Sequence, residues 1–177
     1  MKKDIIILYN VLMICLIVAH AHNNVIGNKG IIPWDLPDDR QHFKELTLGG
    51  VVIMGRRTFE EIYKKFGKGL PGRETIVISR RQNLVGENYR TVASLQAAIE
   101  LSKKVFPNKD IFICGGESVY KEALKENLVK KMYITEIDMR VEGDAFFPEF
   151  DKDSFIIEER KKSLKSFPHE FLTYRHR

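Results

Sequence analysis

Short, continuously apolar runs alternate along the chain with longer segments in which apolar residues recur at helical spacing. Runs of the first kind are typical of buried strands, and segments of the second kind are typical of helices that bury one face. Strands are predicted at Cys15–Ala21, Val51–Met54, Thr75–Ser79, Ile111–Cys114, Lys131–Ile137, Phe155–Arg160 and Glu170–Arg175. Helices are predicted between them at Pro37–Thr47, Thr58–Phe66, Ser94–Val105 and Glu117–Asn127.

The order of these elements indicates how the strands pair. The first four strands are apolar throughout and are separated by helices, which favours parallel pairing with both faces of the sheet covered. The last two strands follow one another without a helix, which favours an antiparallel edge. The predicted fold class is therefore α/β, with a mixed, mostly parallel central sheet and helices on both of its faces.

The first twenty-one residues can be interpreted in two ways. Lys2 and Lys3, the apolar run Ile5–Ala19 and the small residues at Ala19 and Ala21 imitate a secretory signal. Alternatively, the run that begins at Met13 is a buried central strand, and residues 1–12 are an extension of unknown role. We favour the strand because the parallel sheet needs it, and Met13 is then a candidate natural start.

Composition narrows the class of protein. The chain has 177 residues, of which 44% are hydrophobic and 30% are charged. These values are typical of one globular domain and exclude a disordered chain, a collagen and a polytopic membrane protein. Cys15 and Cys114 lie in apolar runs, so we expect two reduced, buried thiols rather than a disulfide scaffold. The net charge of +5 suits an anionic small ligand, and nucleic acid less well because no stretch is densely basic.

Glycines follow two of the predicted core strands at the points where helices begin. Gly55-Arg56-Arg57-Thr58 follows one strand, with Thr58 and Glu61 spaced as a capping box, and Gly115-Gly116 follows another. Helix N-termini beside arginines favour phosphate, and Ser79-Arg80-Arg81 adds positive charge at the end of a third strand. Plain turn chemistry is the alternative. The G-x-G-x-x-G match Gly67–Gly72 follows a helix and contains Pro71, so we interpret it as a surface loop.

One acidic residue falls on an apolar helix face. Asp39, Phe43 and Leu46 are spaced at i, i+4 and i+7, whereas Asp38 does not share this face. A neighbouring polar stripe consists of Arg40, Lys44 and Thr47. Burial should raise the pKa of the Asp39 carboxyl and make it a candidate proton donor or ligand partner. A cap or a structural hydrogen bond is the alternative.

Other catalytic constellations are absent from the sequence pattern. His20 and His22 could share one strand face, but His42, His169 and His176 have no metal-ligand spacing. No arrangement of serine or cysteine with histidine indicates a nucleophile. Phosphate cradles together with one inward acid favour a reductase that uses a nicotinamide cofactor.

At this point the chain resembles the dihydrofolate reductase family, from Ile14 to the C-terminal end. The segment Pro33-Trp34-Asp35-Leu36-Pro37-x-Asp39-x-x-x-Phe43-Lys44 is similar to the family's substrate-site signature, and Val52–Phe59 is similar to its cofactor segment. Further motifs occur in family order: Val25–Gly27, Leu70–Arg73, Gly115-Gly116, Tyr133–Thr135 and Glu142–Pro148. Several ordered motifs together are far more specific than any one of them.

The resemblance implies NADPH-dependent reduction of 7,8-dihydrofolate to tetrahydrofolate, with hydride transfer to C6 and protonation at N5. It implies that Asp39 bonds the pterin, that Thr135 bonds both Asp39 and the pterin, and that Trp34 holds an ordered water. It assigns substrate contacts to Ile17, Val18, Phe43, Lys44, Ile62, Leu70, Arg73 and Cys114, with Arg73 clamping the glutamate α-carboxylate. It assigns cofactor contacts to Ala19, Ile26, Gly27, Gly55, Arg56, Arg57, Thr58, Ser79, Arg80, Cys114, Gly115, Gly116, Glu117, Ser118, Val119 and Tyr120.

The resemblance also implies a cis peptide at Gly115-Gly116 and a mobile lid at Gly27–Leu36, which a loop containing Asp144 helps to close. Arg40, Ile32 and Cys114 depart from the family's usual residues, and Arg40 makes antifolate sensitivity an open question. We expect a reductase domain at residues 13–177 that is a cytoplasmic monomer with no metal, membrane or nucleic-acid partner. Two alternatives stay open: a riboflavin-pathway pyrimidine reductase of the same fold, and a non-catalytic nucleotide-binding module.

Overall fold

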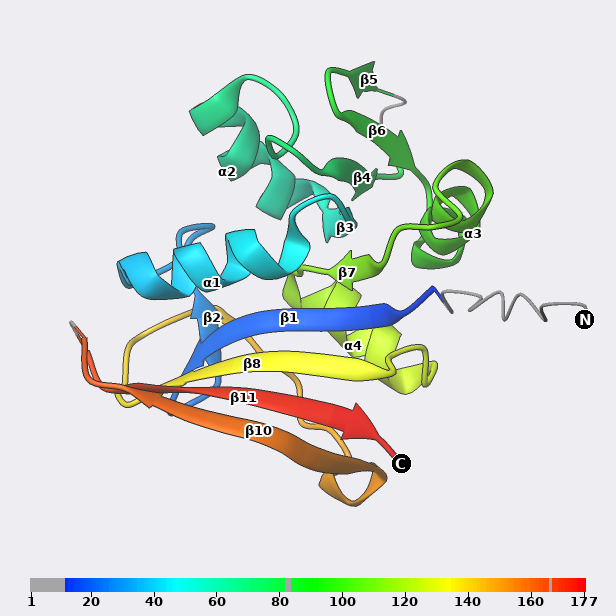
Figure 1. Cartoon of the computed structure of the whole chain (residues 1–177). Coiled ribbons are helices and arrows are strands. Elements are labelled where there is room, and N and C mark those ends of the chain that lie inside the picture. The colour runs from blue at the N-terminus through cyan, green and yellow to red at the C-terminus, as the bar shows by residue number, and fades with distance from the viewer. Residues whose placement is uncertain (1–11, 82–83, 166) are drawn as a thin grey trace, which may run out of the picture.

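A nine-stranded sheet runs through the whole molecule (Figure 1). The computed structural model describes residues 12–81, 84–165 and 167–177. The strands are β1 Ile14–Ala21, β2 Val25–Gly27, β3 Val51–Gly55, β4 Glu74–Ile78, β5 Val85–Gly86, β6 Tyr89–Val92, β7 Ile111–Ile113, β8 Lys131–Ile137, β9 Ala145–Phe146, β10 Phe155–Ser163 and β11 His169–His176. The helices are α1 Pro37–Thr47, α2 Arg56–Phe66, α3 Leu95–Val105 and α4 Glu117–Lys125, with a 3-10 turn at Lys152–Ser154.

The strand order is β10-β11-β8-β1-β7-β3-β4-β6-β5. The six strands from β8 to β6 pair in parallel, and β11 and β10 continue the sheet in antiparallel fashion on the β8 side. The predicted mixed sheet with an antiparallel edge is therefore confirmed. The predicted strand at the N-terminal run is also confirmed as β1, and the interpretation of residues 1–11 lies outside the described residues.

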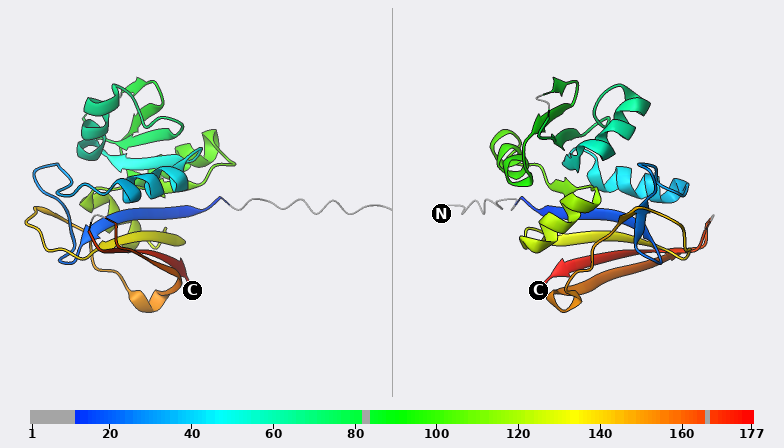
Figure 2. Two further views of the ribbon diagram at one scale, coloured as in Figure 1. Left: turned by 60° about the vertical axis from the view of Figure 1, so that its left-hand side comes forward. Right: turned by 180° about the vertical axis from the view of Figure 1, so that it is seen from behind.

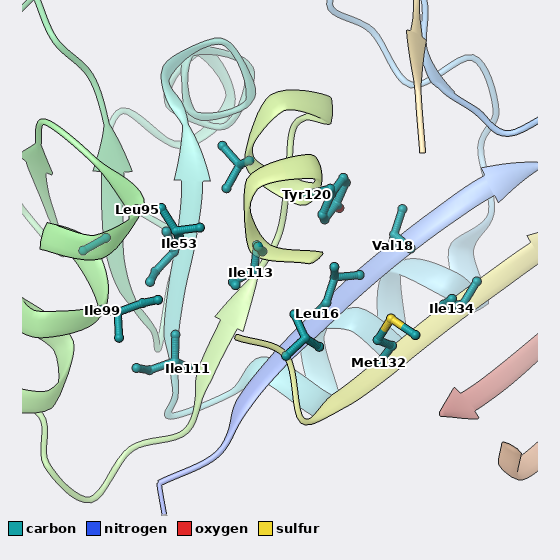
Figure 3. Packing of buried hydrophobic residues seen from close by; sticks show 14 of the residues in the cluster. Leu16, Val18, Ile53, Leu95, Ile99, Ile111, Ile113, Tyr120, Met132 and Ile134 are labelled. Carbon is teal, nitrogen blue, oxygen red and sulfur yellow. The ribbon is translucent and has the colours of Figure 1, made fainter. Parts of the chain in front are cut away.

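Alternate residues of the central strands serve two different cores. Leu16 and Val18 face a cluster that includes residues of α3 and α4, whereas Cys15 and Ile17 face a cluster that includes residues of α1 and α2. Figure 2 shows the helices on both sides of the sheet, and Figure 3 shows the first cluster, where side chains of β1, β3, β7 and β8 meet those of the two helices. This two-sided burial explains why these strands are continuously apolar.

Helix α2 corrects one expectation. It begins at Arg56 with Gly55 as its N-cap and has no side-chain cap, so the predicted capping box of Thr58 and Glu61 is wrong. The strand β3 runs directly into the helix at Gly55, which places Thr58 already inside the first turn. Glu61 instead contacts Lys64, 2.5 Å away.

The short elements escaped sequence-based prediction. Strands β2, β5, β6 and β9 have two to four residues each, too few for a periodic pattern to be recognised. The segment Gly67–Gly72 is a loop between α2 and β4 as expected, and Gly67 ends the helix in the left-handed conformation with φ of 67°. Among the described residues, no helix is long and apolar enough to cross a membrane.

Candidate active site

The Asp39 carboxyl lies where α1 approaches the end of β8. Thr135 Oγ1 donates a hydrogen bond of 2.6 Å to Asp39 Oδ1, which is the contact that the resemblance implies. Asp39 is half-buried, Thr135 is buried, and burial raises the pKa of the Asp39 carboxyl above its ordinary value. The hydrogen bond from Thr135 acts in the opposite direction and is the smaller influence.

Local sequence explains this placement. Pro37 stands in the first turn of α1, where its fixed φ and missing N–H are tolerated, and Asp38 and Asp39 follow in the same turn. Phe43 and Leu46 then pack on the second cluster, which turns the Asp39 side of the helix toward the sheet. The parallel register pairs Ala19 of β1 with Thr135 of β8, so the residues beside the acid come from the centre of the sheet.

An apolar wall extends from the acid along the α1 and α2 face of the sheet. Its members are the predicted substrate contacts Ile17, Phe43, Ile62, Leu70 and Cys114, which all belong to the second cluster or pack against it. Burial raises the pKa of the Cys114 thiol, and its Sγ lies 3.3 Å from the carbonyl oxygen of Phe112. Cys114 is therefore a small apolar member of this wall rather than a nucleophile.

Arg73 stands at the far end of the wall with unused hydrogen-bonding capacity. Its side chain donates to the carbonyl oxygen of Pro71 at 2.9 Å and to Thr47 Oγ1 at 3.4 Å. The residue is only 7% exposed, and burial lowers the pKa of its guanidinium. No carboxylate of the described residues forms an ion pair with it. A buried guanidinium in this state favours an anionic ligand group.

Two helix N-termini converge at the glycine segments. A Cβ built on Gly55 would lie 3.8 Å from the Gly116 nitrogen, and one on Gly116 would lie 3.4 Å from Thr58 Oγ1. Gly55 and Gly116 are the N-caps of α2 and α4, and neither helix has a side-chain cap. The Gly115-Gly116 peptide is cis, as the resemblance implies. The positive ends of both helix dipoles therefore point toward one region.

The predicted phosphate-binding side chains surround this region unevenly. Arg57 and Arg80 are exposed, and Ser79 is buried at the end of β4. Arg56 is half-exposed and contacts Glu60 one turn further along α2, at 3.1 Å. Arg57 and Arg80 are thus better placed than Arg56 to receive an anion.

The predicted cofactor residues of α4 fall into two groups. Glu117 and Ser118 are exposed, and Glu117 Oε2 accepts a hydrogen bond of 2.9 Å from the Phe146 N–H, so this carboxylate anchors the loop at β9. Val119 and Tyr120 are buried in the first cluster. Tyr120 Oη donates to the carbonyl oxygen of Ile17 at 2.8 Å, a link between α4 and β1 that the sequence does not reveal.

The segment between β2 and α1, where a lid is predicted, is tied at its β2 end to a second loop. Strand β2 pairs with β9, and the Lys29 N–H donates to Asp144 Oδ1 at 3.0 Å. Gly143 fits tightly there: a Cβ on it would lie 2.3 Å from a Val25 methyl group and 2.6 Å from the carbonyl oxygen of Gly27.

The side chains of the lid differ in exposure. Ile31 and Ile32 are more than 60% exposed, whereas Ile26 and Trp34 are half-buried. Arg40, the departure in α1, points outward and forms an ion pair with Asp35. Lys44, on the same stripe, is exposed.

Sequence reasoning missed the surroundings of Asp38. Its Oδ2 accepts a hydrogen bond of 2.8 Å from Ser163 Oγ and lies 3.1 Å from His169 Nε2. These partners stand more than a hundred residues further along the chain, so no local spacing could signal them. Asp38 is therefore a hydrogen-bonded, partly buried carboxylate rather than a solvated charge at the helix end.

Two further features of the molecule bear on its chemistry. Within the described ranges, no group of three or more His, Cys, Asp or Glu side chains is placed to hold a metal ion. A cavity of 670 Å³ lies elsewhere, between α4 and the loop before β10.

Comparisons with known proteins place the chain among relatives of one kind. The family model described as dihydrofolate reductase matches residues 13–176. Dihydrofolate reductase type 3 of Salmonella typhimurium is 43% identical over 139 residues, which are 78% of this chain and 80% of the relative. The dihydrofolate reductase of Neisseria gonorrhoeae is 40% identical over 92% of this chain and 98% of its own length. That of Bacillus subtilis is 32% identical over 92% of this chain and 94% of its own length.

Proposed function

This chain belongs to the dihydrofolate reductase family, and from that premise we propose that it reduces 7,8-dihydrofolate to 5,6,7,8-tetrahydrofolate with NADPH. The observation that carries the proposal is the half-buried Asp39 carboxyl, bonded to Thr135 at one end of an apolar wall. At the other end stands Arg73, whose buried guanidinium suits the carboxylate of a folate tail.

The reaction adds one hydride and one proton to the pterin. When bound, the reduced nicotinamide supplies the hydride to C6. The chain must therefore hold the two rings together, exclude water from them and bring a proton to N5. Asp39 is suited to the last task, because burial raises the pKa of its carboxyl and keeps a proton in the site at higher pH than an ordinary aspartate would.

Asp39, Thr135 and Trp34 have separate roles at the pterin ring. Its carboxyl bonds the amino group and a ring nitrogen of the pterin, and Thr135 fixes the carboxyl through the 2.6 Å hydrogen bond. Because the carboxyl occupies that edge of the ring, the proton reaches N5 through a water molecule that Trp34 helps to hold. Trp34 is half-buried in the lid segment, directly before α1.

The glycine segments and nearby arginines suit a phosphorylated dinucleotide. The N-termini of α2 and α4 converge without side-chain caps, which favours a pyrophosphate group between them. Arg57, Arg80 and Ser79 offer two exposed guanidinium groups and a hydroxyl, which suit an additional 2′-phosphate and favour NADPH over NADH.

We further propose that the chain acts as a monomer in the cytoplasm. Cys15 and Cys114 are both free thiols, which accords with a reducing compartment. Sedimentation of the purified chain should give the 20.5 kDa mass of one copy.

The decisive experiment follows the loss of NADPH absorbance with and without dihydrofolate. We expect oxidation only when both are present, and Asp39→Asn should lower turnover by about 10²- to 10⁴-fold, a range typical of losing acid catalysis, while NADPH affinity stays unchanged. Asp153→Asn, which removes an exposed carboxylate in the 3-10 turn, is the matched control and should behave as wild type.

The same assay distinguishes the alternatives. Turnover of a ribosylated pyrimidine but not of dihydrofolate would identify the riboflavin-pathway reductase instead. Nucleotide binding without any turnover would indicate the non-catalytic module. A preference for NADH, or an equal response to both cofactors, would contradict the role given to Arg57, Arg80 and Ser79.

A further inference from the structure

We propose that His169, paired with Asp38, is a positioning residue for Asp39: it neutralises the carboxylate next to the acid and thereby sets the pH range of turnover. This inference rests on the proposed function, because it assigns a regulator to the acid of that reaction. The pair joins the first turn of α1 to the hairpin of β10 and β11, whose turn lies beside that end of the helix (Figures 1 and 2).

Both ring nitrogens of His169 face acceptors. Nδ1 lies 2.7 Å from the carbonyl oxygen of Phe167, and Nε2 lies 3.1 Å from Asp38 Oδ2, an ion-pair contact rather than a well-directed hydrogen bond. The side chain is fully buried, so water cannot replace either contact. An N–H at Nδ1 donates to the Phe167 carbonyl oxygen, and a second proton at Nε2 would face the Asp38 carboxylate.

Asp38 is equally constrained. Ser163 Oγ donates to its Oδ2 at 2.8 Å, and within the described part of the chain its buried Oδ1 has no hydrogen-bond partner. Burial is the strongest single influence and raises the pKa of the Asp38 carboxyl, but the hydrogen bond from Ser163, the charge of His169 and backbone N–H groups together lower it. The Asp38 carboxylate is thus bonded by the Ser163 hydroxyl and faced by the His169 ring.

The pKa of Asp39 depends on the charges of both His169 and Asp38. The charge of His169 lowers the pKa of Asp39, and the charge of Asp38 raises it. The groups that face Asp39 and the pair from the surrounding elements are Asp38, His42 and Glu45 of α1, Thr135 of β8, Glu159, Lys161 and Ser163 of β10, and His169 of β11. His42 lowers the pKa of Asp39 in the same direction and more strongly than His169, and burial lowers the pKa of His42 itself.

Packing holds the hairpin in register with the site. Phe171 stands between two histidine rings, with centroids 4.4 Å from His42 and 5.0 Å from His169. The antiparallel register pairs Phe171 with Thr135, the residue that donates to Asp39. A shift of the hairpin along β8 would therefore move the His169 ring away from Asp38, next to the residue that Thr135 bonds.

The sign of the expected effect follows from these charges. The reaction consumes a proton, so turnover falls as pH rises, and the position of this alkaline limb reports the charge state of the acid. Without His169, the negative charge of Asp38 acts on Asp39 uncompensated, and Asp39 holds its proton more tightly. Removing Asp38 as well withdraws that repulsion.

The test measures kcat against pH for His169→Gln, Asp38→Asn and the double variant. We expect the alkaline limb of His169→Gln to move to higher pH, and the double variant to return toward the wild-type limb, because Asp38 raises the pKa of Asp39 by less than His169 lowers it. Asp38→Asn alone should lie at or below the wild-type limb. Glu122→Gln, which removes an exposed carboxylate on α4 at the other face of the sheet, is the matched control and should leave the limb in place. An unmoved limb in His169→Gln, or a double variant that does not return, overturns the proposal.

A second readout does not depend on turnover or on the stability of His169→Gln. Isotope-edited titration of the Asp39 carboxyl in the free protein should show a lower midpoint in Asp38→Asn than in wild type, or the same midpoint, and never a higher one. A raised Asp39 midpoint in Asp38→Asn refutes the inference, whereas absence of any turnover refutes only the proposed function.

Discussion

Burial raises the pKa of the Asp39 carboxyl, which suits this side chain to donate a proton. The same burial means that the ionised carboxylate lowers the free energy of unfolding. The folded protein holds this proton to higher pH than the unfolded chain, whose carboxyl has the ordinary value of 3.8. The contribution of Asp39 to the free energy of unfolding is therefore neutral below that value. It becomes destabilising as pH rises through the raised pKa of the folded state.

Asp39→Asn should consequently stabilise the protein at neutral pH while it abolishes most turnover. Thr135 can donate to the amide oxygen of asparagine as it does to the carboxylate. Urea unfolding at a series of pH values should give a gain in the free energy of unfolding at pH 7 that disappears in strong acid. A variant less stable than wild type at neutral pH would show that the Asp39 charge is well solvated.

Arg73 makes a second prediction at the scale of one residue. Arg73→Lys keeps the charge but loses the planar fork that bonds a carboxylate twice, so we expect KM for dihydrofolate to rise by about 10- to 100-fold with a smaller change in kcat. The control is dihydropteroate, which lacks the glutamate: its KM should be equal in the two proteins. An equal loss for both substrates would mean that Arg73 only supports the fold, through Thr47 and Pro71.

Sequence alone predicts those site residues whose signal is local. Asp39 is recognised because Phe43 stands one turn away on the same helix face, and the contact with Thr135 follows from the family motifs. Asp38 could not be interpreted in this way, since Ser163 lies 125 residues further along the chain. Only the pairing of β8 with β11 brings that hairpin to α1.

At the scale of the element, the N-termini of the helices show where sequence-based capping rules apply and where they do not. Helix α3 has a genuine side-chain cap, because Ser94 Oγ accepts a hydrogen bond of 3.1 Å from the Ala97 N–H. Ser94→Ala should lower the free energy of unfolding by about 1 kcal/mol. Thr58→Ala should cost clearly less, since α2 begins at Arg56 and Thr58 caps nothing.

Chemical denaturation of the two variants without ligand makes this comparison. If Ser94→Ala and Thr58→Ala lowered the free energy of unfolding equally, Thr58 would act as a cap, as the sequence suggests. The unliganded protein is required, because Thr58 belongs to the proposed cofactor site.

The predicted bounds agree with the structure for elements that are long enough for burial to produce a recognisable hydrophobic pattern in the sequence. Helix α1 spans the predicted residues, and the long strands β1 and β8 deviate by at most one residue at an end. Strands β2 and β9 have no such signal, because the pairing of two distant segments creates them. Strand β10 runs to Ser163, beyond the predicted end at Arg160, since its largely exposed residues are held by pairing with β11.

At the scale of the whole molecule, the sheet separates a core on the α3 and α4 side from the proposed substrate site on the α1 and α2 side. Ile53 is completely buried in the first cluster, against α3, whereas Ile62 is half-buried on the α2 side, where the proposed substrate lies. Ile53→Ala should lower the free energy of unfolding by about 2 to 5 kcal/mol and leave KM for dihydrofolate unchanged in the folded fraction.

Ile62→Ala should do the reverse, with a smaller loss of stability and a higher KM. Unfolding curves and steady-state kinetics on the same preparations make the comparison. A rise in KM for Ile53→Ala of the size seen for Ile62→Ala would mean that the two faces are not independent.

The crowding at Gly143 has a consequence for how this protein can diversify. Even an alanine methyl group would collide there with Val25 and with the main chain at Gly27, on which the lid is rooted. In a saturation library screened for turnover, we expect glycine alone to be recovered at position 143. Gly30, with a φ of 83° but nothing within 4 Å of a built Cβ, should also accept asparagine. The lid is thus free to change its sequence at the tip but not where it is attached.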